Sequence, residues 1–292
     1  MYSDSEFDDR LNEVKRIVRG SLRRTSLRDH VARFAPSVGG GKMLRARLLL
    51  RVGSPAGVSR SGLCRTAAAV EILHAASLLH DDIVDGGTRR RGEPAVWVSE
   101  GARAAVILGD LLMSLAVAGV QEALPTHLPI LIATLRDMCD GEAEQEFADA
   151  GADSSWDQCV GIARRKTGSL FGFAAACAGG SQPARVEALQ RAGYALGTAY
   201  QLADDLLDAC PTPLVADKTL GTDSITGKLT AATAFPTGGV DPRSVITSLL
   251  QESENELASW PDVQQAWREY VRDVVAPLLA QFAGLPCAEA SA

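Results

Sequence analysis

Two stretches of the chain share one pattern, a long and almost uncharged segment that ends in Asp-Asp-x-x-Asp. The first is VEILHAASLLHDDIVD, from Val70 to Asp85, and the second is GYALGTAYQLADDLLDA, from Gly193 to Ala209. Their apolar content predicts two buried helices. The first and last Asp of each motif are four residues apart, so they share a helix face, where their like charges repel.

Buried carboxylates require nearby positive charge. Asp81 and Asp85 are expected to point the same way, as are Asp204 and Asp208. Hard oxygen ligands suit Mg²⁺, which keeps water ligands and completes its shell with substrate phosphates. One such motif could be a solvated helix end, but two copies that each close an apolar helix favour a metal site. An EF-hand loop is excluded, because its alternating ligands, its Gly and its terminal Glu are missing.

The rest of the chain also reads as helical. Runs with strand-like alternation are absent, and Gly-, Pro- and Ser-rich clusters separate stretches with helical spacing. We expect one all-α domain over residues 1–292, a helical bundle around a central apolar cavity. The expected helices cover residues 8–22, 43–52, 58–84, 100–120, 127–149, 155–178, 183–209, 243–256 and 261–283.

The lysines give an independent argument. The chain has 24 arginines and only five lysines, and four of those lysines lie beside Gly or Thr at the edges of expected helices. Compact ammonium groups bind phosphate oxygens as point charges, and arginines add bidentate contacts. The four lysines are Lys42, Lys166, Lys218 and Lys228. Arg45 and the run Arg89-Arg90-Arg91 fit the same role.

Composition excludes other classes of function. The net charge of −7 argues against nucleic-acid binding, which needs a basic face. The first residues lack the form of a signal peptide, and the most apolar stretch, Ala104 to Val120, is interrupted by Asp110, so no membrane span is expected. Six scattered cysteines without C-x-x-C spacing indicate reduced thiols. The expected location is cytoplasmic.

Acidic helix ends, magnesium and basic groups above aliphatic helices favour a substrate with a diphosphate head and a hydrocarbon tail. Metal ions that bridge the diphosphate would make it a better leaving group. An apolar pocket would protect the resulting allylic carbocation from water.

The same segments resemble the trans-isoprenyl diphosphate synthases of the polyprenyl synthetase family, from about Gly39 to Thr230. GGGKMLRA resembles the family's G-G-K-x-x-R-P element, and HDDIVDGGTRRRG resembles the first aspartate-rich motif. Gly141, Glu142 and Gln145 match a Gly-Glu-x-x-Gln element, and Lys166-Thr167 matches a K-T pair. YQLADDLLD resembles the second aspartate-rich motif, and DKTLGTDSITGKLT resembles the closing loop.

The resemblance implies the isoprenoid synthase fold, a homodimer and three Mg²⁺ ions. It assigns the metal to Asp81, Asp85 and Asp204, supported by Asp82, Asp205 and Asp208. It assigns the allylic diphosphate to Arg90, Lys166, Thr167, Gln201, Lys218 and Lys228. It assigns the binding of isopentenyl diphosphate to Lys42, Arg45, His74 and Arg91. The implied reaction is ionisation of the allylic diphosphate, attack by the isopentenyl double bond and loss of a proton.

Some positions depart from the family pattern. Ala46 stands where Pro is usual, Met43 replaces a residue that is often basic, and Tyr200 stands where Phe is common. None of these departures removes a metal ligand or a diphosphate contact. The chain after Thr230 shows little of the usual continuation.

Product length follows partly from helix geometry. A hydrocarbon tail that grows along the helix of the first motif meets Ser77 and Ala76, which are both small. Short-chain members of the family resemble one another in placing aromatic residues at these positions. Small residues let the tail pass at least one more turn, so we expect a C20 product, geranylgeranyl diphosphate, or a longer one. A floor from Met113 or Phe171 is the alternative.

Two other functions compete with chain elongation. A terpene cyclase on the same scaffold needs ionisation but no isopentenyl partner, so it has no reason to keep Lys42, Arg45, His74 and Arg91 together. A non-catalytic partner subunit could lose aspartates freely, whereas both motifs are complete here.

Overall fold

The computed structural model describes residues 4–147, 155–208, 229–232, 234 and 241–283, and over these residues the chain is almost entirely helical. Two long helices organise the molecule, α4 (Arg60–Val84) and α10 (Pro183–Asp208). They are the two apolar segments that the sequence predicts to be helices, and they end at the two aspartate motifs. The all-α expectation is therefore confirmed.

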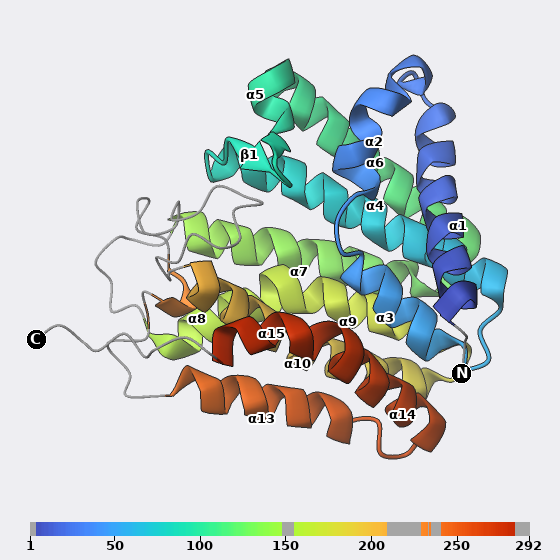
Figure 1. Ribbon diagram of the computed structural model, residues 1–292, viewed down its shortest axis with the longest axis vertical. Coiled ribbons are helices and arrows are strands. Elements are labelled where there is room, and N and C mark those ends of the chain that lie inside the picture. Colours follow the sequence, from blue (N-terminus) through green and yellow to red (C-terminus); the bar gives the residue numbers. More distant parts are fainter. Residues whose placement is uncertain (1–3, 148–154, 209–228, 233, 235–240, 284–292) are drawn as a thin grey trace, which may run out of the picture.

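Each long helix has its own set of neighbours. Around α4 pack α6 (Ala102–Ala123), α1 (Asp4–Arg23), α3 (Leu44–Gly53) and α2 (Val31–Gly39). Around α10 pack α9 (Ser169–Cys177), α13 (Pro242–Asn255), α8 (Trp156–Ala163) and α15 (Ala276–Ala283). In Figure 1, α7 (Leu128–Phe147) lies between these two groups, and α9 also contacts α3 and α4.

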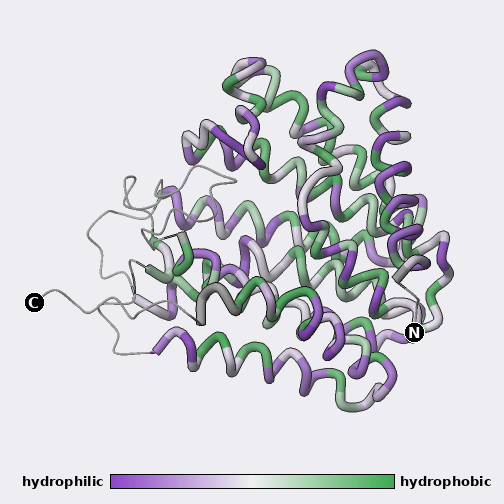
Figure 2. Tube along the Cα trace, in the orientation of Figure 1, coloured by the Kyte–Doolittle hydropathy of each residue, from purple (hydrophilic) through white to green (hydrophobic). Residues whose placement is uncertain are grey.

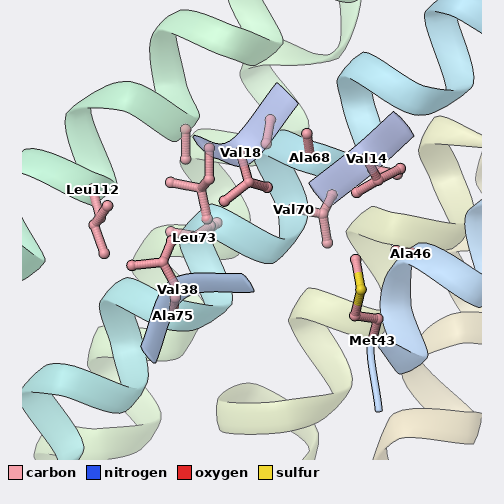
Figure 3. Packing of buried hydrophobic residues seen from close by; sticks show 14 of the residues in the cluster. Val14, Val18, Val38, Met43, Ala46, Ala68, Val70, Leu73, Ala75 and Leu112 are labelled. Atoms are coloured by element: carbon pink, nitrogen blue, oxygen red, sulfur yellow. The ribbon is translucent and has the colours of Figure 1, made fainter. Parts of the chain in front are cut away.

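The core follows this division. One cluster of buried apolar residues surrounds α4, with Leu73 and Leu112 fully buried in it, and Figure 3 shows part of this packing. Two others line α10, one of them with Trp267 and Tyr270 from α14 (Pro261–Tyr270). Polar and apolar residues alternate along the outer helices α1 and α13 in Figure 2, as expected for helices with one face on the core.

Two of the expected helices contain a π-helical turn. The segment expected as one helix over 155–178 is α8, then η3 (Arg164–Gly168), then α9, and the last expected helix is α14, η4 (Val271–Val275) and α15. Single π turns inside α-helices occur frequently at functional sites. In this chain η3 carries the predicted Lys166-Thr167 pair.

Several short elements were not predicted from the sequence. Helix α2 contains Pro36, which removes a backbone donor and is unusual inside a helix. A short helix, α5 (Val96–Glu100), precedes α6, and two 3-10 turns cover Arg28–His30 (η1) and Pro125–His127 (η2). After α4, β1 (Arg89–Arg90) pairs antiparallel with β2 (Glu93–Pro94), with Arg90 opposite Glu93.

Candidate active site

The first aspartate motif lies at the end of α4. Asp85 follows the last helical residue with near-helical backbone angles, and its N–H donates to the carbonyl of Asp81 at 2.8 Å. Asp81 and Asp85 are therefore one turn apart on one side of the helix, as predicted. Both are partly buried.

The middle residue of this motif has a different role. Asp82 is only 3% exposed, and its Oδ1 accepts from Nε of Arg90 at 2.9 Å and also from Nη2 of that residue. The turn between β1 and β2 has positive φ at both Arg91 (54°) and Gly92 (78°), which is typical of a type I′ hairpin. This hairpin brings Arg90 back against the end of α4.

Asp81 is in an environment that disfavours its negative charge. Burial raises the pKa of Asp81 to about 7, with the charges of Glu142 and Asp85 acting in the same direction, while Lys166 and Arg90 oppose the shift. A carboxylate placed this way gains more from a bound cation than a solvated one does.

The π turn η3 lies beside α7. Lys166 Nζ donates to Gln145 Oε1 at 2.5 Å and forms an ion pair with Glu142, both on α7. Gln145 Nε2 donates in turn to the carbonyl of Leu229 at 2.7 Å. The glycine at position 141 lets α7 approach η3 closely, because a Cβ on this residue would lie 2.8 Å from Cβ of Arg165. The predicted Lys166, Glu142 and Gln145 thus form one polar cluster.

The second aspartate motif connects to η3 from the other side. Thr167 Oγ1 donates to Gln201 Oε1 at 2.6 Å, and Gln201 Nε2 donates to Asp205 Oδ1 at 2.6 Å. The other oxygen of Asp205 accepts the N–H of Ala231 at 3.1 Å. Because the charge of Lys166 lowers the pKa of Asp81 and its neighbour Thr167 donates to Gln201, η3 lies near both motifs.

The second aspartate makes the same kind of contact in both motifs. In each, the second Asp (Asp82 or Asp205) is held by hydrogen bonds within the protein. Asp204 is partly buried on α10, and Asp208 is the last residue of that helix. Two predicted phosphate-binding lysines, Lys218 and Lys228, lie outside the described residues.

A second group of basic residues lies at the start of α3. Arg45 is 8% exposed, its guanidinium lies 4.6 Å from the centre of the Phe171 ring, and its Nε has no hydrogen-bond partner among the described residues. Lys42, just before α3, is exposed. A buried guanidinium with an unused donor fits an anionic ligand.

Arg91 and His74 join this group. Arg91 Nη1 donates to the carbonyls of Pro36 (3.3 Å) and Ser37 (3.2 Å). Gly41 has φ +89°, and a Cβ on it would lie 2.9 Å from Nε of Arg91, so the glycine-rich segment is needed for this contact. Burial and then the charges of Arg45, Arg91 and Arg90 lower the pKa of His74 well below its usual value, so this imidazole is neutral at pH 7.

Sequence reasoning missed one member of this group. Glu71 is 5% exposed and its carboxylate accepts the N–H of Ala46 at 2.9 Å. A signal was available, since Glu71 is the only acidic or basic residue other than histidine between Arg65 and Asp81.

The carboxylates suit an ion that binds through few protein ligands. Among the residues that the structure describes, no three His, Cys, Asp or Glu side chains gather closely enough to hold one ion. Mg²⁺ is commonly bound through one or two carboxylates together with substrate phosphates and water, so paired aspartates beside basic groups fit it.

The Polyprenyl synthetase family matches residues 32–266 of the chain. A short chain isoprenyl diphosphate synthase of Methanothermobacter thermautotrophicus is 30% identical over 230 residues, which are 75% of this chain and 71% of that protein. A geranylgeranyl diphosphate synthase of Mycobacterium tuberculosis is 33% identical over 198 residues, 65% of this chain and 57% of the relative. An octaprenyl diphosphate synthase of Haemophilus influenzae is 33% identical over 196 residues, 66% of this chain and 60% of that relative.

A solved structure also resembles this one closely. A polyprenyl synthase from Caulobacter crescentus CB15, crystallised with calcium and isoprenyl diphosphate, superposes with a TM-score of 0.77 at 27% identity over 94% of both chains. The isoprenoid synthase fold and the predicted family are thereby confirmed. The chain belongs to the polyprenyl synthetase family, and it is an isoprenyl diphosphate synthase, a prenyltransferase, by that membership.

Proposed function

We propose that the enzyme condenses isopentenyl diphosphate with an allylic diphosphate in a magnesium-dependent, 1′-4, trans reaction. The observation that carries this proposal is the link through η3, in which Lys166 interacts with the first motif and Thr167 contacts the second. Two acidic helix ends joined by a lysine and a threonine can enclose one diphosphate with its metal ions.

Each part of the site has a task in this reaction. Mg²⁺ ions, three in number by the resemblance, would be held by Asp81, Asp85, Asp204 and Asp208, and would neutralise the charge that develops on the leaving diphosphate. Asp82 and Asp205 support them, Asp82 by fixing Arg90 and Asp205 by fixing Gln201. The allylic diphosphate is bound by Arg90, Lys166, Thr167, Gln201, Lys218 and Lys228.

The second substrate occupies the basic group at the start of α3. Lys42, Arg45, His74 and Arg91 bind isopentenyl diphosphate and orient its double bond toward the allylic carbon. Buried aliphatic residues next to the aspartates, among them Leu79 and Leu202, exclude water from the allylic cation. The proton released after the new bond forms is accepted by the departed diphosphate.

The product is a C20 isoprenyl diphosphate or a longer one. Ala76 is fully buried, and the same face of α4 continues one turn lower with Ile72 and then with Ala69 and Ala68. Ala68 lies about 20 Å below Asp81 along the helix. There, Ile72, Ala68 and Ala69 line a groove of about 440 Å³ between α1, α4 and α6, with Gly119 opposite them.

The small residues of α4 in this groove support the depth argument, although Arg16, Arg24, Arg65 and Glu122 also line it. The alternative floors are Phe171 and Met113. Phe171 packs under Arg45 and beside Tyr200, in the apolar cluster of α10, and Met113 lines a hollow on the outer side of α6.

The enzyme works as a homodimer through an exposed apolar face of α6 and α7. Ile107 is 67% exposed and Ile132 is 59% exposed. The same two helices also carry a hollow of about 560 Å³, lined by Met113, Val117 and Leu135 among others. Large exposed apolar side chains of this kind mark an interface, and a second copy would cover them.

By length and composition alone, α4 and α6 could each cross a membrane. The apolar window of α4 is 72% buried, which identifies it as a core helix, whereas that of α6 is 33% buried because of the exposed face just described. No membrane span is proposed. The described cysteines are free thiols, which supports the expected cytoplasmic location.

The proposal is tested by incubating the protein with Mg²⁺, isopentenyl diphosphate and, in separate reactions, dimethylallyl, geranyl or farnesyl diphosphate. Mass spectrometry should detect a longer isoprenyl diphosphate that forms only with isopentenyl diphosphate and Mg²⁺. Hydrocarbon released without consumption of isopentenyl diphosphate would indicate the terpene cyclase instead. Turnover only after mixing with a second synthase would indicate the partner subunit.

A further inference from the structure

Glu71 is a buried carboxylate for which neither the metal site nor the substrates provide a role. It lies ten residues before Asp81 on α4, which is about 15 Å along the helix axis. That separation places it away from the ion-binding end of the helix. A buried charge is costly unless its surroundings compensate it, so its partners show what it does.

The first partner is the start of α3. Glu71 Oε1 accepts the N–H of Ala46 at 2.9 Å, and Ala46 is the third residue of that helix. Met43, which precedes α3, has a left-handed conformation with φ 49° and makes no side-chain capping bond. A carboxylate from α4 therefore takes the place of the missing cap, and its charge is favourable at a helix N-terminus.

This contact depends on a departure from the family pattern. The resembling element has Pro where this chain has Ala46, and Pro has no N–H to donate. The hydrogen bond that joins α3 to α4 here is thus made possible by Ala46.

The second set of partners is the basic group. Glu71 interacts electrostatically with Arg45 and Arg91, and Arg45 is the residue just before Ala46. The Nε of Arg45 has no hydrogen-bond partner among the described residues. The guanidinium groups of Arg45 and Arg91 would repel each other without a counter-charge, and Glu71 supplies it from within the protein.

We propose that Glu71 is a positioning residue, whose carboxylate holds the start of α3 and the guanidinium of Arg45 in the orientation that receives the second diphosphate. It does not touch substrate. The proposal rests on the proposed function, since it takes the basic group at α3 as the isopentenyl diphosphate site.

Glu71→Gln separates this role from simple packing. Glutamine keeps the volume and an oxygen for the Ala46 N–H, but it removes the charge that faces Arg45 and Arg91. We expect the KM for isopentenyl diphosphate to rise about tenfold, equivalent to about 1.4 kcal/mol. The KM for the allylic diphosphate should stay within about twofold. Glu71→Leu, which also removes the acceptor, should raise the isopentenyl diphosphate KM further.

Glu269→Gln is the matched control. Glu269 is 7% exposed, accepts a hydrogen bond from Gln265 within α14, and belongs to no part of the candidate site. Circular dichroism and thermal unfolding of all three variants report folding. If Glu71 is only structural, Glu71→Gln and Glu269→Gln should lose stability while neither changes the ratio of the two KM values, and that result overturns the proposal.

Calorimetric titration of isopentenyl diphosphate into the protein, without allylic substrate, measures the affinity of the same site independently of turnover. Weaker binding to Glu71→Gln than to the wild type supports the proposal. Equal or tighter binding, with normal turnover in the wild type, overturns it and leaves the proposed function standing. A wild-type protein that neither binds isopentenyl diphosphate nor condenses it overturns both.

Discussion

Asp82 and Arg90 form an ion pair at the end of α4, with Arg90 Nε donating to Asp82 Oδ1 at 2.9 Å and the carboxylate 3% exposed. Eight residues separate them, and the hairpin of β1 and β2 closes the loop between them. The second aspartate of the first motif therefore fixes Arg90, the arginine proposed to bind phosphate, while Asp81 and Asp85 lie on the neighbouring face of the helix.

The first prediction follows from this pair. Asp82→Asn should lower the free energy of unfolding by about 2 kcal/mol, because a charged hydrogen bond is lost and Arg90 is left without its counter-charge. It should raise the KM for the allylic diphosphate without changing the Mg²⁺ concentration needed for half-maximal rate. Urea unfolding and magnesium titration of the rate measure these two effects. A shift in magnesium requirement as large as that of Asp81→Asn would contradict the assignment.

The second prediction concerns the proposed metal ligands. Asp81→Ala or Asp204→Ala should reduce magnesium-dependent condensation at least about 10³-fold, because the developing charge on the diphosphate loses its stabilisation. The helical circular dichroism spectrum should not change. Asp262→Ala, an exposed carboxylate in the first turn of α14, is the control and should retain activity. Full turnover by either site variant would refute the metal assignment.

The third prediction concerns product length. Ala76→Phe should shorten the product, because the ring fills the space one turn below the reacting carbons. Ile72→Ala should lengthen it by opening the path from Ala76 to the groove between α1, α4 and α6. Mass spectrometry of the products with farnesyl diphosphate as primer distinguishes these outcomes, and Ser248→Ala on the exposed face of α13 is the control. An unchanged product in both Ala76 and Ile72 variants would show that the tail follows another route.

The fourth prediction concerns assembly. Ile107→Arg together with Ile132→Arg should convert a dimer into a monomer, because charged side chains cannot be buried unpaired in an apolar interface. Light scattering after size-exclusion chromatography gives the molar mass, and circular dichroism confirms the helices. Ser248→Arg, on α13, should leave the dimer intact. If the wild type is itself monomeric, the apolar face has another occupant.

The sequence by itself determined the long helices and the kinds of residue that can form the candidate site. Local periodicity is enough to place a long apolar helix, so the expected helices over 58–84 and 183–209 correspond to α4 and α10. The four-residue spacing likewise places Asp81 and Asp85 on one face. The sequence did not predict α2, because Pro36 disfavours a helix locally and packing against α1 and α4 compensates for it.

Only the tertiary structure decided how the parts meet. Spacing does not show that Asp82 pairs with Arg90, that Thr167 contacts Gln201, or that Glu71 reaches Ala46, because each contact joins elements whose relative position is set by packing of the core. A residue's type and neighbours along the chain fix its local conformation and charge, whereas its partners across space depend on how all the helices bury their apolar faces together.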